Sequence, residues 1–203
     1  NTYDGTEKFP VLMNLHGFSG DAGYHLAETN MPYAAHSNKY LLVYPQGALL
    51  EGEPHWNPCL PSDDNKSDID DLGFVEALLN QVSSDYLVDR NKVYVVGYSN
   101  GGMMSYGLAM HKSELITAFG SVSGTMLDCG EQPNHPMPVI VMHGTNDFTI
   151  PYDGSSDTVS IETTMEYCNS FNNTNTTPVL TSASDVGEKG SSVEIERYQY
   201  SDG

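Results

Sequence analysis

Basic side chains are scarce in this sequence: 8 Lys and Arg stand against 27 Asp and Glu, which gives a formal net charge of −19. Binding to nucleic acid or to an anionic membrane surface depends on Lys and Arg that release counterions, so the charge balance argues against both. The sequence also has no apolar run near the roughly 18–20 residues that a membrane-spanning helix needs. We therefore expect no nucleic-acid partner and no membrane partner.

Cysteine is also rare, and the three cysteines, Cys59, Cys129 and Cys168, are far apart without a C-x-x-C pair. This spacing argues against a zinc or thioredoxin-like site and allows at most one internal disulfide. The motifs of nucleotide-binding, dinucleotide-binding and zinc-protease sites are missing as well. The carboxylates within residues 63–71 lack the spacing and the glycine of a calcium loop, so we interpret them as a solvated face with a helix cap. We expect no metal and no cofactor.

The pattern of apolar residues predicts one α/β domain over residues 1–203, because no repeat or shift in composition divides the chain. Short, almost continuous apolar runs alternate with helix-periodic stretches, as in a parallel sheet covered on both faces. The predicted strands are 10–15, 40–44, 92–96, 116–122 and 138–142, and the predicted helices are 24–36, 71–86, 103–110 and 159–171. A polar surface excursion over 172–192 would precede one more strand over 193–200. The fold class is therefore a three-layer α/β sandwich with a mostly parallel sheet, whose ligands bind at the carboxyl ends of the strands.

One turn between a predicted strand and a predicted helix carries a serine in a G-x-S-x-G pattern, at residues 97–101. Its two glycines let the helix approach the strand closely, and the sharp turn would expose the hydroxyl of Ser99 at the carboxyl edge of the sheet. We interpret Ser99 as a catalytic nucleophile. The alternative is a glycine-rich turn with an incidental serine.

A serine nucleophile needs preorganised donors for the oxyanion that forms when it attacks a carbonyl group. The backbone N–H of Asn100, at the positive end of the following helix, is one candidate. The loop at residues 15–20 should supply the second, and we choose the N–H of Phe18, with the N–H of Ser19 as the alternative. The imidazole of His16 is interpreted as a structural anchor of this loop rather than as a base.

The acid that orients a base is expected in a loop after a later strand, and Asp147 occupies that place after the strand predicted over 138–142. The alternative role for Asp147 is to cap an Asx-turn. The chain order of serine, acid and histidine then requires a histidine after Asp147, but all seven histidines precede it. His143 is a weak substitute, because it lies at a strand end only four residues upstream. We expect the base beyond Gly203.

As a set, several motifs resemble those of a known family. They are L-H-G-F-S-G at 15–20, Y-P-Q-G at 44–47, H-W-N-P at 55–58, D-I-D-D-L-G-F at 68–74, V-D-R-N-K-V-Y-V-V-G-Y-S-N-G-G-M-M at 88–104, S-V-S-G-T-M at 121–126 and H-G-T-N-D-F-T-I-P-Y-D-G at 143–154. The chain resembles the α/β-hydrolase esterases grouped with feruloyl esterases and polyhydroxybutyrate depolymerases. The resemblance implies that Ser99 is the nucleophile and Asp147 the acid.

The resemblance also implies features that this sequence lacks. Proteins of this family begin with extra antiparallel strands and carry the catalytic histidine after a final strand, so 1–203 would be the central part of a longer chain, without the first strands and the last strand. A secreted or periplasmic location is implied too, where a disulfide would persist. Cys59 with Cys129 is one hypothesis for the pair. Cys168, which stands where related proteins often carry an aromatic residue, is equally well interpreted as a buried free thiol.

Around Ser99 we expect an apolar, aromatic rim that binds the substrate, made of Phe18, Tyr98, Trp56, Ile150 and Tyr152. Trp56, the one tryptophan of the sequence, is as readily interpreted as a core or loop-anchoring residue. The rim would suit an aryl or short acyl group, as in a small-molecule or polysaccharide-linked ester.

Two functions from different classes follow. The first is a serine carboxylic-ester hydrolase that acts through an acyl-enzyme on feruloyl, acetyl or short-chain polyester substrates. The second is a non-catalytic binding module that kept the serine turn and lost the general base, and the missing histidine motivates it. The sequence does not decide the acyl group, the alcohol or the oligomeric state.

Overall fold

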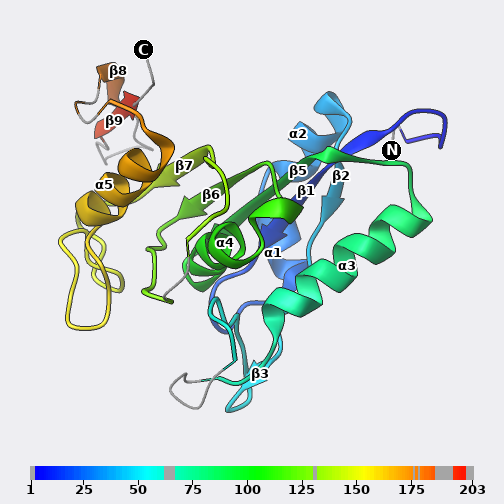
Figure 1. The fold of residues 1–203 in the computed structure, drawn as a ribbon, viewed down its shortest axis with the longest axis horizontal. Coiled ribbons are helices and arrows are strands. Elements are labelled where there is room, and N and C mark those ends of the chain that lie inside the picture. Colours follow the sequence, from blue (N-terminus) through cyan, green and yellow to red (C-terminus); the bar gives the residue numbers. More distant parts are fainter. Residues whose placement is uncertain are drawn as a thin grey trace.

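A five-stranded parallel sheet forms the centre of the molecule, with its strands in the order β2-β1-β5-β6-β7 (Figure 1). The computed structural model describes residues 3–61, 67–129, 132–175, 177, 179–185 and 194–199. The strands are β1 (Phe9–Leu15), β2 (Leu41–Val43), β5 (Val88–Tyr98), β6 (Ala118–Val122) and β7 (Val139–Met142). Each neighbouring pair runs parallel. The predicted parallel sheet is confirmed.

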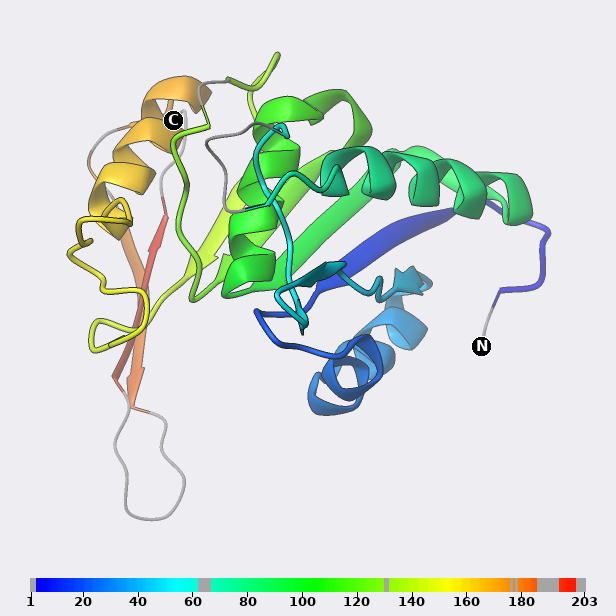
Figure 2. The same cartoon turned by 90° about the horizontal axis from the view of Figure 1, so that it is seen from below.

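Helices cover both faces of this sheet, which confirms the predicted three layers (Figure 2). One face carries α1 (Ala22–Glu28) and α2 (Met31–Asn38). The opposite face carries α3 (Asp71–Asp85), α4 (Asn100–His111) and α5 (Ile161–Asn172), and the short 3-10 helix η1 (Ser113–Leu115) follows α4. A small antiparallel pair, β3 (Leu49–Leu50) with β4 (Glu53–Pro54), lies outside the main sheet.

The core lies where the apolar faces of the helices meet the sheet. In α3 the spacing i, i+3 and i+7 places Leu72, Val75 and Leu79 on one buried side. Burying an aliphatic side chain this completely stabilises the fold by about 1.5–3 kcal/mol. α3 begins at a cap, because the Asp70 carboxylate accepts the Gly73 N–H at 2.8 Å. This confirms a capping role within the carboxylate run, of which Asp63 and Asp64 lie outside the described residues.

Two predicted elements differ from the observed ones. The helix predicted over 24–36 is divided into α1 and α2, because Pro32 is tolerated in the first turn of a helix but not in its middle. The polar excursion predicted over 172–192 is wrong for residues 179–185, which form β8 (Val179–Asp185). β8 pairs antiparallel with β9 (Glu194–Gln199), in a region predicted to be a strand. A polar segment becomes a strand here because its partner satisfies its backbone hydrogen bonds.

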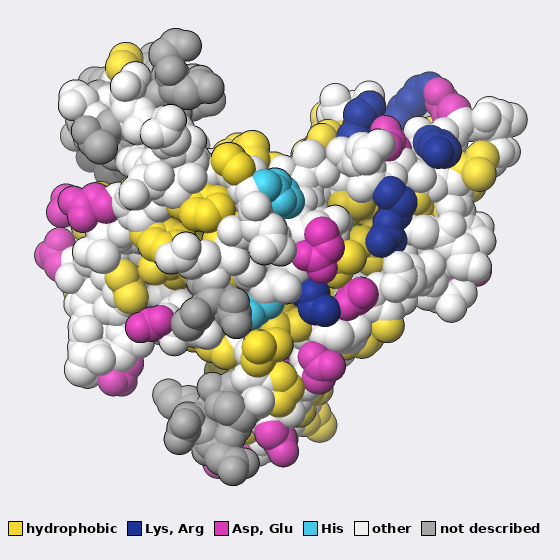
Figure 3. Space-filling model, in the orientation of Figure 1, with side chains coloured by type: hydrophobic (Ala, Val, Ile, Leu, Met, Phe, Trp, Pro, Cys, Tyr) yellow, Lys and Arg dark blue, Asp and Glu magenta, His cyan; other side chains and the backbone are white. Residues whose placement is uncertain are grey.

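A disulfide joins Cys59 to Cys129, 70 positions apart in sequence, and leaves Cys168 as a buried free thiol. Both hypotheses about the cysteines are confirmed. No helix in the described part of the chain is long and apolar enough to cross a membrane. On the face seen in Figure 3, the few Lys and Arg gather toward the end of the molecule that carries the N-terminus.

Candidate active site

Ser99 lies in a sharp turn between the end of β5 and the start of α4. Its backbone has φ 52° and ψ −116°, a conformation that residues with a side chain rarely adopt and that costs about 1–3 kcal/mol. The Ser99 N–H donates to the Val122 carbonyl at 2.8 Å, and the Ser99 carbonyl accepts the Met103 N–H at 3.0 Å. These bonds hold the half-buried serine at the carboxyl end of the sheet. The turn has the geometry that the G-x-S-x-G pattern predicts, and the role of Ser99 as nucleophile stays a prediction.

Glycine is required on both sides of this turn. A Cβ atom on Gly97 would lie 2.0 Å from the Gly101 carbonyl oxygen, and one on Gly101 would lie 2.4 Å from the Leu15 carbonyl oxygen. Both distances are far inside van der Waals contact, and the obstacles are backbone atoms. The glycines therefore bring β1, β5 and α4 close enough for the turn to form.

The loop after β1 lies directly against the serine. A Cβ atom on Gly17 would lie 3.4 Å from the Ser99 Cβ. The Ser19 N–H is already bonded to the Pro54 carbonyl at 2.8 Å, whereas the Phe18 N–H bonds to no residue that the structure describes. Of the two loop donors that the sequence allowed, Phe18 is the one whose N–H is not already engaged in this way. The backbone N–H of Asn100, at the first position of α4, is likewise without a bond to described residues.

His16 anchors this loop. It is buried, its Nδ1–H donates to the Gly17 carbonyl at 2.7 Å, and its Nε2 accepts the Gly47 N–H at 2.9 Å. A carbonyl can only accept, so these bonds fix the proton on Nδ1. With both nitrogens occupied, His16 is not positioned to act as a base, which confirms the structural role predicted for it.

Asp147 follows β7, and its carboxylate closes a tight turn. Oδ1 accepts the N–H of Ile150 at 3.0 Å and of Thr149 at 2.9 Å. The Ile150 N–H is the largest cause that holds the pKa of the Asp147 carboxyl below its usual range, against the opposing effect of burial, and the Ser123 hydroxyl adds a small lowering contribution. The Asx-turn predicted as the alternative role is thus present. Both backbone bonds of this turn go to Oδ1, and the role of Asp147 as the acid stays a prediction.

His143 is not placed to replace the missing histidine. Its side chain is 1% exposed, and its Nε2–H donates to the Ile150 carbonyl at 2.8 Å. Nε2 also lies 3.8 Å from the Asp147 Oδ2, and Nδ1 is buried with no partner among the residues that the structure describes. His143 thus holds the loop after β7 that carries Asp147, here called the acid loop, through its bond to Ile150. It has no solvent-facing nitrogen to receive a proton from Ser99.

The end of β6 connects the serine turn to the acid loop. Val122 accepts the Ser99 N–H, and the next residue, Ser123, donates its own N–H to the Met142 carbonyl at 2.8 Å. Ser123 has φ 50°, a left-handed value that few non-glycine residues adopt. No role was predicted for Ser123 from the sequence, where its one signal is its place in the S-V-S-G-T-M motif at the end of a predicted strand.

Four of the residues predicted for the substrate rim are exposed or half-buried. Phe18 is 56% exposed and Tyr98 is 50% exposed beside the serine turn. Ile150 and Tyr152 are half-buried in the acid loop. These four residues stay candidates for substrate contact.

Two roles were predicted for Trp56, and the structure bears out the core or loop-anchoring role, whereas the position on the rim is wrong. Its side chain is 1% exposed, and its indole N–H donates to the His16 carbonyl at 3.0 Å. A buried indole needs a partner for its N–H, and this bond draws Trp56 under the loop rather than onto the surface. Phe148, which was not predicted on the rim, is 95% exposed next to Asp147.

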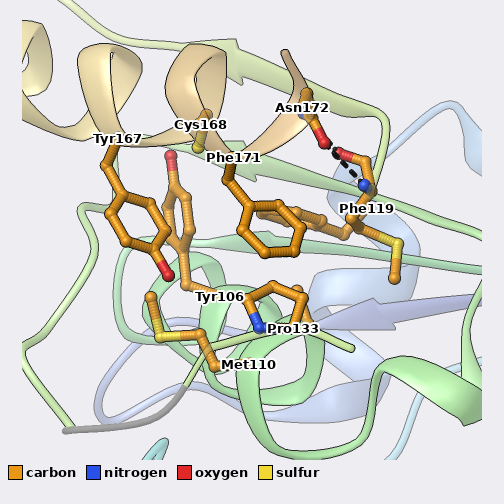
Figure 4. A pocket seen from close by; sticks show the side chains of 10 residues that line it. Tyr106, Met110, Phe119, Pro133, Tyr167, Cys168, Phe171 and Asn172 are labelled. Carbon is orange, nitrogen blue, oxygen red and sulfur yellow. Dashed lines mark hydrogen bonds between the residues drawn. The ribbon is translucent and has the colours of Figure 1, made fainter. Parts of the chain in front are cut away.

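A separate apolar crevice lies between α4, α5 and β6, away from the serine turn (Figure 4). Tyr106 rises into it from α4, while Tyr167 and Phe171 descend from α5. The hydroxyl groups of Tyr106 and Tyr167 are buried and have no partner among the described residues. Desolvation raises the pKa of the Cys168 thiol beside them to about 11, so this thiol stays protonated.

No cluster of metal-ligating side chains occurs among the residues with described positions. Asp71, within the carboxylate run, is buried and accepts the Asn57 N–H at 2.7 Å. Desolvation is the main cause that raises the pKa of the Asp71 carboxyl. Its role is to hold the loop at 55–58 against the start of α3.

Comparison with known sequences gives several matches. A family model described as phospholipase/carboxylesterase matches residues 4–184. The chain is 29% identical over 143 residues to a bifunctional acetylxylan esterase/xylanase from Neocallimastix patriciarum, covering 70% of this chain and 20% of that protein. It is 35% identical over 85 residues to a probable feruloyl esterase C from Aspergillus niger, covering 42% of this chain and 32% of that protein. The chain thus spans no more than a third of the length of these two relatives.

Solved structures share the fold. An acetyl xylan esterase from Aspergillus awamori superimposes with a TM-score of 0.64 at 16% identity, over 91% of this chain and 76% of that chain. A carboxylesterase from Bacillus cereus superimposes with a TM-score of 0.62 at 22% identity, over 83% of this chain and 76% of that chain. At such identities the likeness shows the arrangement of the sheet and its helices alone.

Proposed function

This chain belongs to the phospholipase/carboxylesterase family, with the α/β-hydrolase fold that its motifs predicted, and we propose that it is a serine carboxylic-ester hydrolase. Ser99 would form the acyl-enzyme. The observation that carries the proposal is the strained turn, which presents Ser99 against Gly17 of the loop after β1 and at the start of α4, two segments in which the N–H groups of Phe18 and Asn100 bond to no described residue.

The proposed reaction has two steps that share one oxyanion site. The Ser99 hydroxyl attacks the ester carbonyl carbon and gives its proton to a histidine base, while the carbonyl oxygen becomes an oxyanion bound by the two N–H groups. The intermediate collapses to the acyl-enzyme and expels the alcohol, which takes the proton from the histidine. Water then repeats the attack and releases the acid. Each oxyanion donor lowers the activation free energy by roughly 3 kcal/mol.

The proposed reaction needs a histidine base for Ser99. All seven histidines of the chain precede Asp147, and the rings of His16 and His143 are held by other bonds. The Asp147 carboxylate, kept ionised by its low pKa, would orient the imidazole and stabilise its charged form.

The substrate class proposed is a feruloyl, acetyl or short-chain polyester-type ester, free or linked to a polysaccharide. The names of the acetylxylan and feruloyl esterases that the chain resembles support this class. The exposed rings of Phe18 and Tyr98 beside the serine would give an aryl or short acyl group an apolar contact. The disulfide supports a secreted or periplasmic location, since such bonds persist in oxidising compartments.

A non-catalytic binding module is the second candidate, because no histidine follows Asp147 within residues 1–203 and the rings of His16 and His143 are held by other bonds. The decisive experiment uses the full natural protein with p-nitrophenyl acetate and methyl ferulate, together with a fluorophosphonate probe. We expect turnover and covalent labelling, both abolished in Ser99→Ala and both kept in Ser84→Ala, which alters an exposed serine on α3. Ester binding without turnover or labelling would favour the binding module.

A further inference from the structure

Trp56 and Asn100 form a two-way hydrogen-bonded pair. The Trp56 N–H donates to the Asn100 Oδ1 at 2.7 Å, and the Asn100 Nδ2 donates to the Trp56 carbonyl at 2.9 Å. Both polar ends of the Asn100 side chain are thereby used, so its orientation is fixed. Because Asn100 is the first residue of α4, this pair ties the start of the helix to the loop at 55–58.

Trp56 also reaches the other proposed donor loop. Its indole N–H donates to the His16 carbonyl at 3.0 Å, and its ring lies 5.0 Å from the His16 ring. His16 comes two residues before Phe18 in the sequence, and its Nδ1–H donates to the carbonyl of Gly17, the residue between them. One buried tryptophan therefore contacts the segments that carry both unbonded N–H groups.

The loop that carries Trp56 is itself firmly held. The Asn57 N–H donates to the buried Asp71 carboxylate at 2.7 Å, and the Asn57 Nδ2 donates to the carbonyls of Ser67 and Ile69 at 3.1 and 2.9 Å. Two residues further on, Cys59 is bonded to Cys129. Trp56 is thus fixed to the rest of the fold independently of its contacts with the serine turn.

We propose that Trp56 and the Asn100 side chain are positioning residues, which set the distance between the Phe18 and Asn100 N–H groups so that both can bind one oxyanion. This inference rests on the proposed esterase function. Donors stabilise an oxyanion well only when they lie about 2.7–3.1 Å from its transition-state position, so a small displacement of either segment lowers the rate. Trp56 acts through the two backbone segments and does not touch the substrate.

The test compares four variants of the full natural protein: Trp56→Phe, Asn100→Asp, Asn100→Ala and Tyr106→Phe. Trp56→Phe removes the bond to His16 and keeps the backbone contacts with Asn100. Asn100→Asp keeps the acceptor for the Trp56 N–H and loses the donor, whereas Asn100→Ala loses both. Tyr106→Phe is the matched control, because it removes a buried aromatic hydroxyl that has no described partner and that faces the separate crevice.

Each variant is measured by kcat, by KM, and by the Ki of a trifluoromethyl ketone whose hemiketal oxyanion occupies the same donors. Titration with the fluorophosphonate probe gives the fraction of active protein and so removes the effect of misfolded material. We expect kcat to fall about tenfold in Trp56→Phe and more in Asn100→Ala, with KM within about twofold and with Ki rising by the same factor as kcat falls. Tyr106→Phe should change none of these values.

Several outcomes would overturn the inference. An unchanged kcat and Ki per active site in Trp56→Phe and Asn100→Ala would show that the donors do not depend on these residues. A rise in KM alone would assign Trp56 to substrate binding. If Trp56→Phe does not fold, the two Asn100 variants decide the case. Because Asn100→Asp keeps one bond to Trp56 and Asn100→Ala keeps none, a smaller loss of kcat and a smaller rise of Ki in Asn100→Asp would support the inference, and the reverse order would overturn it. A wild-type protein without turnover or labelling would instead overturn the proposed function, and the inference with it.

Discussion

The N–H of Ser99 donates to the Val122 carbonyl, which joins the serine turn after β5 to the end of the neighbouring strand β6. Ser123, the next residue, bonds in turn to the end of β7 and contributes to the low pKa of Asp147. The candidate nucleophile and the candidate acid are thus connected through one strand end. Their relative position depends on the register of three parallel strands rather than on flexible loops.

The strain at Ser99 predicts a difference between two inactive variants. Ser99→Gly should raise the free energy of unfolding by about 1 kcal/mol relative to Ser99→Ala, because glycine adopts φ 52° without the cost that a Cβ imposes. Urea unfolding of both variants measures this difference. Equal stability would show that the turn is not strained.

The pH dependence of stability should report the Asp147 carboxylate. Its folded-state pKa is lowered, mainly by the Ile150 N–H, so the unfolded chain takes up the proton first as the pH falls. The stabilisation is therefore complete above the usual pKa of an aspartate, about 3.9, and is lost as the pH drops through the lower folded value. We expect the difference in unfolding free energy between wild type and Asp147→Asn to shrink as the pH falls from neutral through the usual aspartate pKa and then through the lowered folded-state pKa. A difference that is constant over this range would contradict the assignment.

The disulfide between Cys59 and Cys129 should stabilise the folded protein. Replacing Cys59 and Cys129 together by alanine should lower the free energy of unfolding, measured with urea, by about 2–4 kcal/mol, because the bridge closes a long loop in the unfolded chain.

Cys168 should react with iodoacetamide only after unfolding, since burial shields it and raises its pKa to about 11. Mass spectrometry of native and urea-treated protein measures the labelling. Rapid labelling of native Cys168 would place it at the surface.

Two tyrosines with different surroundings give a matched pair. Tyr106→Phe should keep or slightly raise stability, because the hydroxyl that it removes is buried without a described partner. Tyr44→Phe should lower the free energy of unfolding by about 1–2 kcal/mol, because it leaves the amide of the buried Asn14 without its acceptor. Thermal unfolding of the two variants measures both effects. The reverse order would mean that the Tyr106 hydroxyl has a partner.

Local patterns in the sequence were sufficient to predict most of the elements around the site. The apolar run before Gly97 and the glycines on both sides of Ser99 predicted the turn, since these properties act over a few residues. The polarity of residues 179–185 predicted an excursion and not β8, because strand pairing depends on a partner distant in sequence. The sequence left two roles open for Trp56, because aromatic character is shared by residues of a rim and of a core, and only its burial decided between them.

The sequence by itself determined that a serine follows a buried strand, that an aspartate follows a later one, and that no histidine follows the aspartate within residues 1–203, because chain order and residue identity do not depend on folding. Only the tertiary structure decided that the N–H of Phe18, unlike that of Ser19, bonds to no described residue, that the side chains of His143 and Trp56 are buried, and that Cys59 pairs with Cys129. Each of these depends on which backbone or side-chain atom lies within about 3 Å of another from a remote part of the chain, and only packing sets that distance.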